Sequence, residues 1–174
     1  KPPGGGDHAD YSFRTMAADQ VAVMNQLGLG EFSVVAHDRG ARVTHRMLLD
    51  HPEAVTRAAL LDILPTKYVY DHTDRALATA YFHWFFFIQP APLPELMMES
   101  NATLLLKAFL GAFGGADSYD PAAMAEYERC FATPDAIHAM CEDYRAAASI
   151  DLVHDAADAG RKVECPLLIL WGTR

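Results

Sequence analysis

The chain has 174 residues, of which 51% are hydrophobic and 21% charged, a balance typical of a soluble globular protein with material for one core and an inserted lobe. Its formal net charge of -9 argues against a nucleic-acid partner, because phosphate binding needs a basic surface. No apolar run is long enough to span a bilayer and we find no signal peptide, so we expect no membrane association.

Cysteine usage points to a reducing compartment. Cys130, Cys141 and Cys165 show no paired spacing, which predicts reduced thiols in a cytoplasmic protein. No Cys/His cluster has the spacing of a zinc site, and the sequence predicts neither a metal nor a cofactor. The chain begins at Lys1 without Met and stops just after an apolar run at Gly172, so we interpret it as a segment of a longer protein.

The first third of the chain alternates between helical and strand patterns. Apolar spacing and turn residues predict a helix over residues 11–27, a buried strand over 32–36, a helix over 39–49 and a second strand over 57–62. This alternation predicts an α/β fold with a mainly parallel sheet flanked by helices.

The pattern changes after Pro65. From there to about Arg161 it is helical and interrupted by prolines, and a strand pattern returns over residues 165–172. We interpret the helical block as a cap inserted between two strands. The expected organisation is therefore a core over residues 1–64, a helical cap over 65–162 and a returning core strand over 163–174.

A reactive turn is predicted where the first strand meets the following helix. In Ala36-His37-Asp38-Arg39-Gly40, small residues flank one reactive side chain, the pattern of a nucleophile elbow. Small residues suit such a turn because its backbone is strained and the strand and helix approach closely. An aspartate nucleophile would attack a carbon that bears a leaving group and form an alkyl ester. The alternative is that Asp38 only caps the helix.

Two arginines follow Asp38 on the same helix. Arg39 and Arg42 are three residues apart and can converge on one side. They could hold a substrate carboxylate beside the nucleophile, since guanidinium groups bind carboxylates through paired hydrogen bonds. Alternatively, Arg42 forms an ordinary surface ion pair with Asp38, four residues before it.

Together these features resemble the haloacetate (fluoroacetate) dehalogenases of the α/β-hydrolase superfamily. The matching segments are HDRGAR at 37–42, LDILPT at 61–66, YFHW at 81–84, QPAPLPE at 89–95 and MCEDYRA at 140–146. The first segment is shared with epoxide hydrolases, and the combination is more specific. The resemblance implies a partial α/β-hydrolase fold with a helical cap, and hydrolysis of a small haloacid to glycolate and halide.

The resemblance also implies a role for each residue of the site. Asp38 would displace the halide, Arg39 and Arg42 would bind the substrate carboxylate, and Asp62 would orient a catalytic histidine. His83, Trp84 and Tyr144, from the cap, would surround the departing halide.

The halide-binding roles are chemically reasonable. A halide that leaves its hydration shell needs donors, which an imidazole, an indole and a phenol can supply. The alternative for these three residues is ordinary packing in the cap, and for Asp62 a turn carboxylate at the end of a strand.

Some expected parts of the site are missing. In this superfamily the base histidine follows a later strand, downstream of Gly172, and an early oxyanion-hole loop would precede Lys1; we do not assign the base to His154. The chain alone is therefore expected not to turn over, and the resemblance implies a homodimer for the parent.

Open alternatives are an epoxide hydrolase, in which cap tyrosines would protonate the epoxide, a haloalkane dehalogenase, which Arg42 disfavours, and a non-catalytic protein that binds a small carboxylate.

Overall fold

A computed structural model describes residues 5–111, 115 and 118–173, so the ends of the expected core at residues 1–4 and 174 lie outside it. Strands β1 (Phe32–His37), β2 (Val55–Leu61) and β3 (Leu167–Leu170) form a parallel sheet in the order β1-β2-β3. His37 pairs with Leu61, and Leu61 pairs with Leu170. The carboxyl ends of the strands therefore meet at one edge of the sheet, and the predicted α/β class is confirmed.

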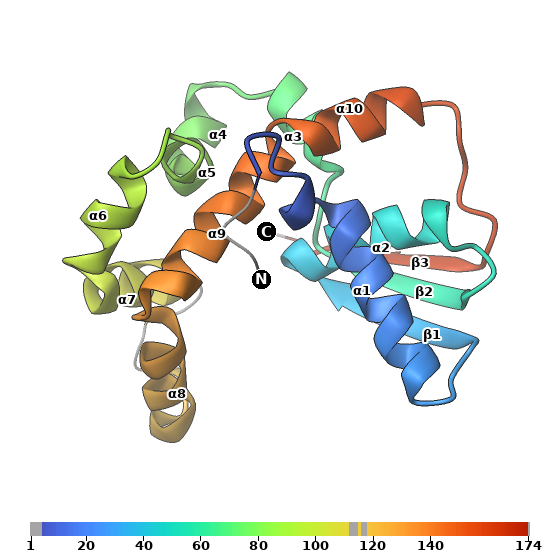
Figure 1. The fold of residues 1–174 in the computed structure, drawn as a ribbon, viewed down its shortest axis with the longest axis horizontal. Coiled ribbons are helices and arrows are strands. Elements are labelled where there is room, and N and C mark those ends of the chain that lie inside the picture. Colours follow the sequence, from blue (N-terminus) through green and yellow to red (C-terminus); the bar gives the residue numbers. More distant parts are fainter. Residues whose placement is uncertain (1–4, 112–114, 116–117, 174) are drawn as a thin grey trace.

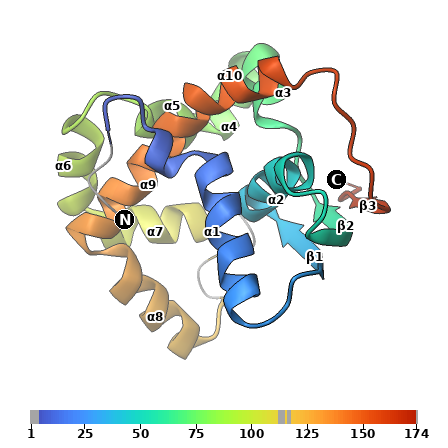
Figure 2. The ribbon, with the colours of Figure 1, turned by 45° about the vertical axis from the view of Figure 1, so that its right-hand side comes forward.

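Two helices cover one face of the sheet (Figures 1 and 2). These are α1 (Phe13–Gln26), preceded by the 3-10 turn η1 (Ala9–Tyr11), and α2 (Asp38–Asp50). Helix α1 begins where it does because the Ser12 side chain accepts the Thr15 N–H at 3.2 Å. It ends before Gly28, whose φ of 79° suits a residue without a side chain.

The core lies between these helices and the sheet. Its buried members are Ala17, Val21, Met47, Leu48, Ala54, Val55 and Ala58, and we call them the core cluster. On β1, Phe32 and Val34 point toward it, while Val35, on the other side of the pleat, is 77% exposed. The strand itself is confirmed, but the prediction that it is buried is wrong. Period-2 alternation leaves its second face open, and Leu168 and Ile169 of β3 are exposed too.

Helices occupy the segment between β2 and β3, and the structure assigns no strand to the described residues 62–166. They are α3 (Thr66–Asp71), α4 (Arg75–Ala80), α5 (Phe82–Phe87), α6 (Leu93–Glu99), α7 (Ala102–Gly111), α8 (Pro121–Phe131), α9 (Pro134–Ala147) and α10 (Ile150–Ala157). We refer to them together as the cap helices. The domain boundaries given above stay a prediction. No helix in the described ranges is both long and apolar enough to cross a membrane.

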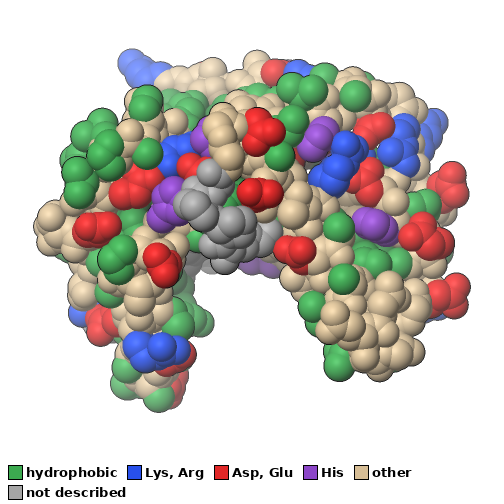
Figure 3. Space-filling model, in the orientation of Figure 1, with side chains coloured by type: hydrophobic (Ala, Val, Ile, Leu, Met, Phe, Trp, Pro, Cys, Tyr) green, Lys and Arg blue, Asp and Glu red, His purple; other side chains and the backbone are tan. Residues whose placement is uncertain are grey.

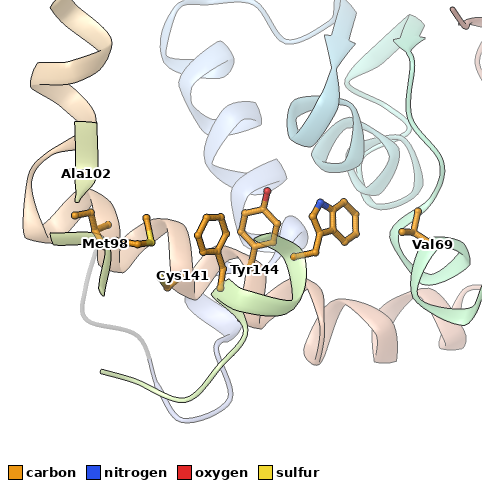
Figure 4. Close-up of a cluster of buried hydrophobic side chains, with 8 residues drawn as sticks. Val69, Met98, Ala102, Cys141 and Tyr144 are labelled. Carbon is orange, nitrogen blue, oxygen red and sulfur yellow. The ribbon is translucent and has the colours of Figure 1, made fainter. Parts of the chain in front are cut away.

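The cap helices have a hydrophobic cluster of their own, drawn in Figure 4, which we call the cap cluster. It consists of Val69, Trp84, Phe87, Met98, Ala102, Ile137, Cys141 and Tyr144. Tyr144 lies in the middle of the row of side chains, and its hydroxyl points out of that row (Figure 4). The space-filling view shows a notch between the arm formed by α8 and the arm that holds β1 (Figure 3).

A buried ionic network ties α6 to α9 inside the cap. The Arg145 guanidinium binds Glu95 at 2.6 and 3.1 Å, Glu142 at 2.9 Å and the Gln89 carbonyl at 2.7 Å. All three charged side chains are buried. Glu142 also meets His8 Nδ1 at 2.8 Å, which joins the N-terminal loop to the cap. Glu142 and Arg145 therefore have a structural role in the cap.

A single carboxylate joins α10 to the start of α1. Both Asp151 oxygens accept the Phe13 N–H, at 3.0 and 3.2 Å, and the side chain is 1% exposed. Burial raises the pKa of Asp151 to about 7, although the Phe13 N–H opposes the shift. A carboxyl whose pKa is higher in the folded than in the unfolded state binds more protons when folded. Its contribution to stability is therefore complete below about pH 4 and is lost as the pH rises to about 7.

We expect Asp151→Asn to remove this contribution, because the amide keeps an acceptor for the Phe13 N–H and cannot ionise. The free energy of unfolding of the unmodified chain should fall between pH 5 and pH 7 more steeply than that of the variant, as measured by urea unfolding at both pH values. The exposed Asp19→Asn provides the control. Parallel pH profiles for Asp151→Asn and the unmodified chain would contradict the assignment.

Candidate active site

Asp38 occupies a strained backbone position directly after β1. It is the first residue of α2 and has a φ of 49°, in the left-handed region that residues other than glycine seldom adopt. His37 is the N-cap, and no side-chain hydrogen bond caps this helix. The capping interpretation of Asp38 is therefore wrong. The expected crowding at Gly40 is also wrong, because a Cβ there would meet no atom within 4 Å.

Asp62 takes the matching place after β2, with a φ of 55°. Its N–H donates to the Leu170 carbonyl at 2.8 Å, and its Oδ1 accepts the Gly172 N–H at 3.1 Å. Because His37 pairs with Leu61, Asp38 and Asp62 follow neighbouring positions at the carboxyl edge of the sheet. Both side chains are exposed there.

Arg39 reaches from α2 to the cap helices. Its Nη2 donates to the Asp143 carbonyl at 3.0 Å, and its Nε contacts the Asp143 carboxylate. The guanidinium lies 4.2 Å from the centre of the Tyr144 ring and 5.2 Å from that of Phe13. Burial would lower the pKa of Arg39, but Asp143 outweighs it and the pKa is raised. Nη1 is buried and has no hydrogen-bond partner.

Arg42 is buried, which rules out the surface ion pair considered above. Its Nη1 donates to the Leu64 carbonyl and lies 3.4 Å from Thr66 Oγ1, and its guanidinium lies 4.6 Å from the centre of the Trp84 ring. Its Nε is buried without a partner. Burial lowers the pKa of Arg42, while the charge of Asp38 opposes the shift. An arginine remains a cation in this setting.

The structure brings the three predicted halide-binding residues together. The His83 ring lies 5.9 Å from the Tyr144 ring, and the Trp84 ring lies 6.0 Å from it. Trp84 and Tyr144 also belong to the cap cluster, so packing and a site role are compatible for both.

These three side chains can act as neutral donors. Burial lowers the pKa of His83, which favours the neutral imidazole with one N–H. Burial raises the pKa of Tyr144 to about 12, which keeps the phenol protonated at neutral pH. The charge of Asp38 acts in the raising direction on the pKa of both groups, while burial is the largest cause for each.

Sequence reasoning missed two residues at this site. Asp143 holds Arg39, although it belongs to a segment that the resemblance already includes. Tyr70 has a buried hydroxyl without a partner, its ring lies 5.5 Å from the Trp84 ring, and no motif surrounds it in the sequence. His154 lies in α10, 3.7 Å from Asp151. None of the histidines in the described part of the chain forms a hydrogen bond or ion pair with Asp62.

Comparisons with known proteins show which sequences this chain is similar to. A fluoroacetate dehalogenase from Burkholderia sp is 46% identical over 99% of this chain and 58% of its own length. A soluble epoxide hydrolase from Corynebacterium sp. (strain C12) is 26% identical over 93% of the chain and 57% of its own length. The chain thus spans less than two thirds of each of these relatives.

Solved structures give the same picture. An alpha/beta hydrolase from Nostoc sp PCC 7120 superposes with a TM-score of 0.95 and 53% identity, over 99% of this chain and 60% of that one. A mutant protein from Pseudomonas aeruginosa, described as an epoxide hydrolase and solved with bound MFA, superposes with a TM-score of 0.92 and 42% identity. The match covers 97% of this chain and 58% of that one. The family described as alpha/beta hydrolase fold matches residues 1–174. The chain therefore belongs to the alpha/beta hydrolase fold family.

Proposed function

We propose that the protein of which this chain is part hydrolyses a haloacetate to glycolate and halide through an ester on Asp38. One observation carries the proposal. Arg39 and Arg42 follow the exposed Asp38 on the first turn of α2, and each has a buried guanidinium nitrogen without a partner. Buried donors without partners are rare in proteins, and a bound anion would satisfy both.

In the first step, an Asp38 oxygen attacks the α-carbon of the substrate. A carbon–oxygen bond forms while the carbon–halogen bond breaks, and the halide leaves with the bonding electrons. Arg39 and Arg42 would hold the carboxylate and offset the repulsion between two anions. His83, Trp84 and Tyr144 supply N–H and O–H groups that replace the water around the halide.

In the second step, water attacks the Cγ carbonyl of the Asp38 ester, and glycolate leaves with the oxygen that came from Asp38. This step needs a base that removes a proton from the water. Asp62 stands at the adjacent strand end, where a carboxylate can orient a histidine. We propose that role for Asp62. The halogen preferred depends on the size of the site.

Epoxide hydrolysis is the second candidate. The likeness to proteins named for that activity supports it, and so do the hydroxyls of Tyr70 and Tyr144, since a phenol can protonate an epoxide oxygen. A neutral epoxide, however, gives Arg39 and Arg42 no anion to bind. The likeness to the Burkholderia fluoroacetate dehalogenase fits the arginines better.

Parallel assays of the longer protein test the proposal. We expect halide release from fluoroacetate or chloroacetate, without diol formation from an epoxide. Diol formation would favour the second candidate, and carboxylate binding without turnover would favour a non-catalytic relative. For the 174-residue chain itself we expect, at most, one carboxymethyl group added to Asp38 per molecule, because no described histidine contacts Asp62. Sustained halide release from this chain would contradict that expectation.

A further inference from the structure

The Tyr70 hydroxyl is a buried polar group without a partner. It lies on α3, its oxygen is buried, and it forms no hydrogen bond. A buried hydroxyl normally has a partner, because leaving one unsatisfied destabilises the folded state. The proposed function, as stated above, gives this group no role in binding.

Tyr70 packs against an aromatic ring of the group that contacts the two arginines. Its ring lies 5.5 Å from the Trp84 ring, which stacks on the Arg42 guanidinium at 4.6 Å. Trp84 also neighbours Tyr144, whose ring faces the Arg39 guanidinium at 4.2 Å. Tyr70 therefore belongs to the same set of rings that holds the two guanidinium groups in place.

The electrostatics distinguish Tyr70 from the halide-binding residues. Burial raises the pKa of Tyr70 to about 12, and the cations that oppose the shift are Arg39 and Arg42. The charges of both Asp38 and Arg39 act on the pKa of His83 and of Tyr144. Tyr70 is thus an O–H donor at neutral pH.

We propose that the Tyr70 hydroxyl is a third donor to the substrate carboxylate, alongside Arg39 and Arg42, and that it strengthens the selectivity of the site for carboxylates. This inference rests on the proposed function. The Tyr70 hydroxyl can donate to an anion that both guanidinium groups bind, and the anion gives the hydroxyl the acceptor that the protein does not. Such a bond forms in the ground state and the transition state alike, so it acts mainly on KM.

Tyr70→Phe tests the inference with little change in packing, because only the oxygen is removed. Tyr68→Phe is the matched control on the same helix, since Tyr68 is exposed and stacks on His72 at 3.9 Å. Both variants are made in the longer protein. Acetate is the probe for binding, measured by calorimetry, and chloroacetate is the substrate for kinetics. We expect Tyr70→Phe to weaken acetate binding and to raise KM by about ten- to a hundredfold, the effect of losing a hydrogen bond to a charged group. kcat and inhibition by bromide should stay unchanged, and the unfolding midpoint should not fall, because the removed hydroxyl has no partner in the protein. Every property of Tyr68→Phe should stay unchanged.

The outcomes separate this inference from the proposed function. Halide release with unchanged KM and unchanged acetate binding in Tyr70→Phe would overturn the role of Tyr70 alone. A loss of kcat with unchanged acetate binding would also overturn it. Acetate binding that depends on Tyr70, in a protein that releases no halide, would support the carboxylate site and overturn the dehalogenase proposal.

Discussion

Asp38→Asn is expected to reduce halide release from a haloacetate by about 10⁴- to 10⁶-fold, the range seen when a nucleophile or its close partner is removed from a covalent enzyme. The amide is nearly the same size as the carboxylate, but its oxygen is too weak a nucleophile to displace halide from carbon. Halide release by the longer protein measures the loss. A single turnover in oxygen-18 water should label the Asp38 carboxylate of the unmodified protein, because water attacks the ester at Cγ.

A surface aspartate serves as the control for this substitution. Asp71 ends α3 and pairs with Lys67 at 2.7 Å on the surface, so Asp71→Asn should leave the rate unchanged. If Asp38→Asn retained substantial activity, or if the label appeared first in glycolate, water would be the direct nucleophile. Asp38 would then act as a base.

Arg145→Ala is expected to lower the free energy of unfolding by about 3–5 kcal/mol, which is a large part of the total for a domain. The loss is large because Glu95 and Glu142 would remain buried without their cation. The fall in the urea midpoint, at constant slope, gives the value. The loss of stability arises within the cap helices, so it can be measured without an active enzyme.

The exposed pair of Glu126 and Arg129 is the matched control, with the same spacing of three residues and a contact of 2.5 Å. Arg129→Ala should leave the midpoint within experimental error, because exposed ion pairs contribute little. Equal effects of the two substitutions would mean that water reaches the Arg145 network and that burial does not set its contribution.

Much of the fold could be predicted because local patterns agree with the final contacts. The β-branched run at 32–36 and the helix after Asp38 lie where the spacing of apolar residues indicates. The segment predicted as a strand over residues 57–62 pairs with β1 on one side and with β3 on the other. Its assignment from sequence depended on the elements around it.

The errors have physical causes as well. An apolar strand predicts burial on both faces, but the face that carries Val35 is not covered by the described residues. The contact between Arg39 and Asp143 joins positions 104 residues apart, and no local pattern encodes it. Tyr70 could not be identified from the sequence for a similar reason, because the environment of its hydroxyl depends on the packing of α3 beside α5.

The contacts between the core cluster and the cap cluster differ in chemistry from the contacts within each cluster. Described contacts between the two halves include Arg39 with Asp143, Asp151 with Phe13 and His8 with Glu142, all of which involve a charged or titratable group. The two clusters are apolar and keep their strength in salt, whereas salt screens and weakens the contacts between charged groups. At low salt the two halves are therefore coupled during unfolding, and high salt moves them toward independent melting.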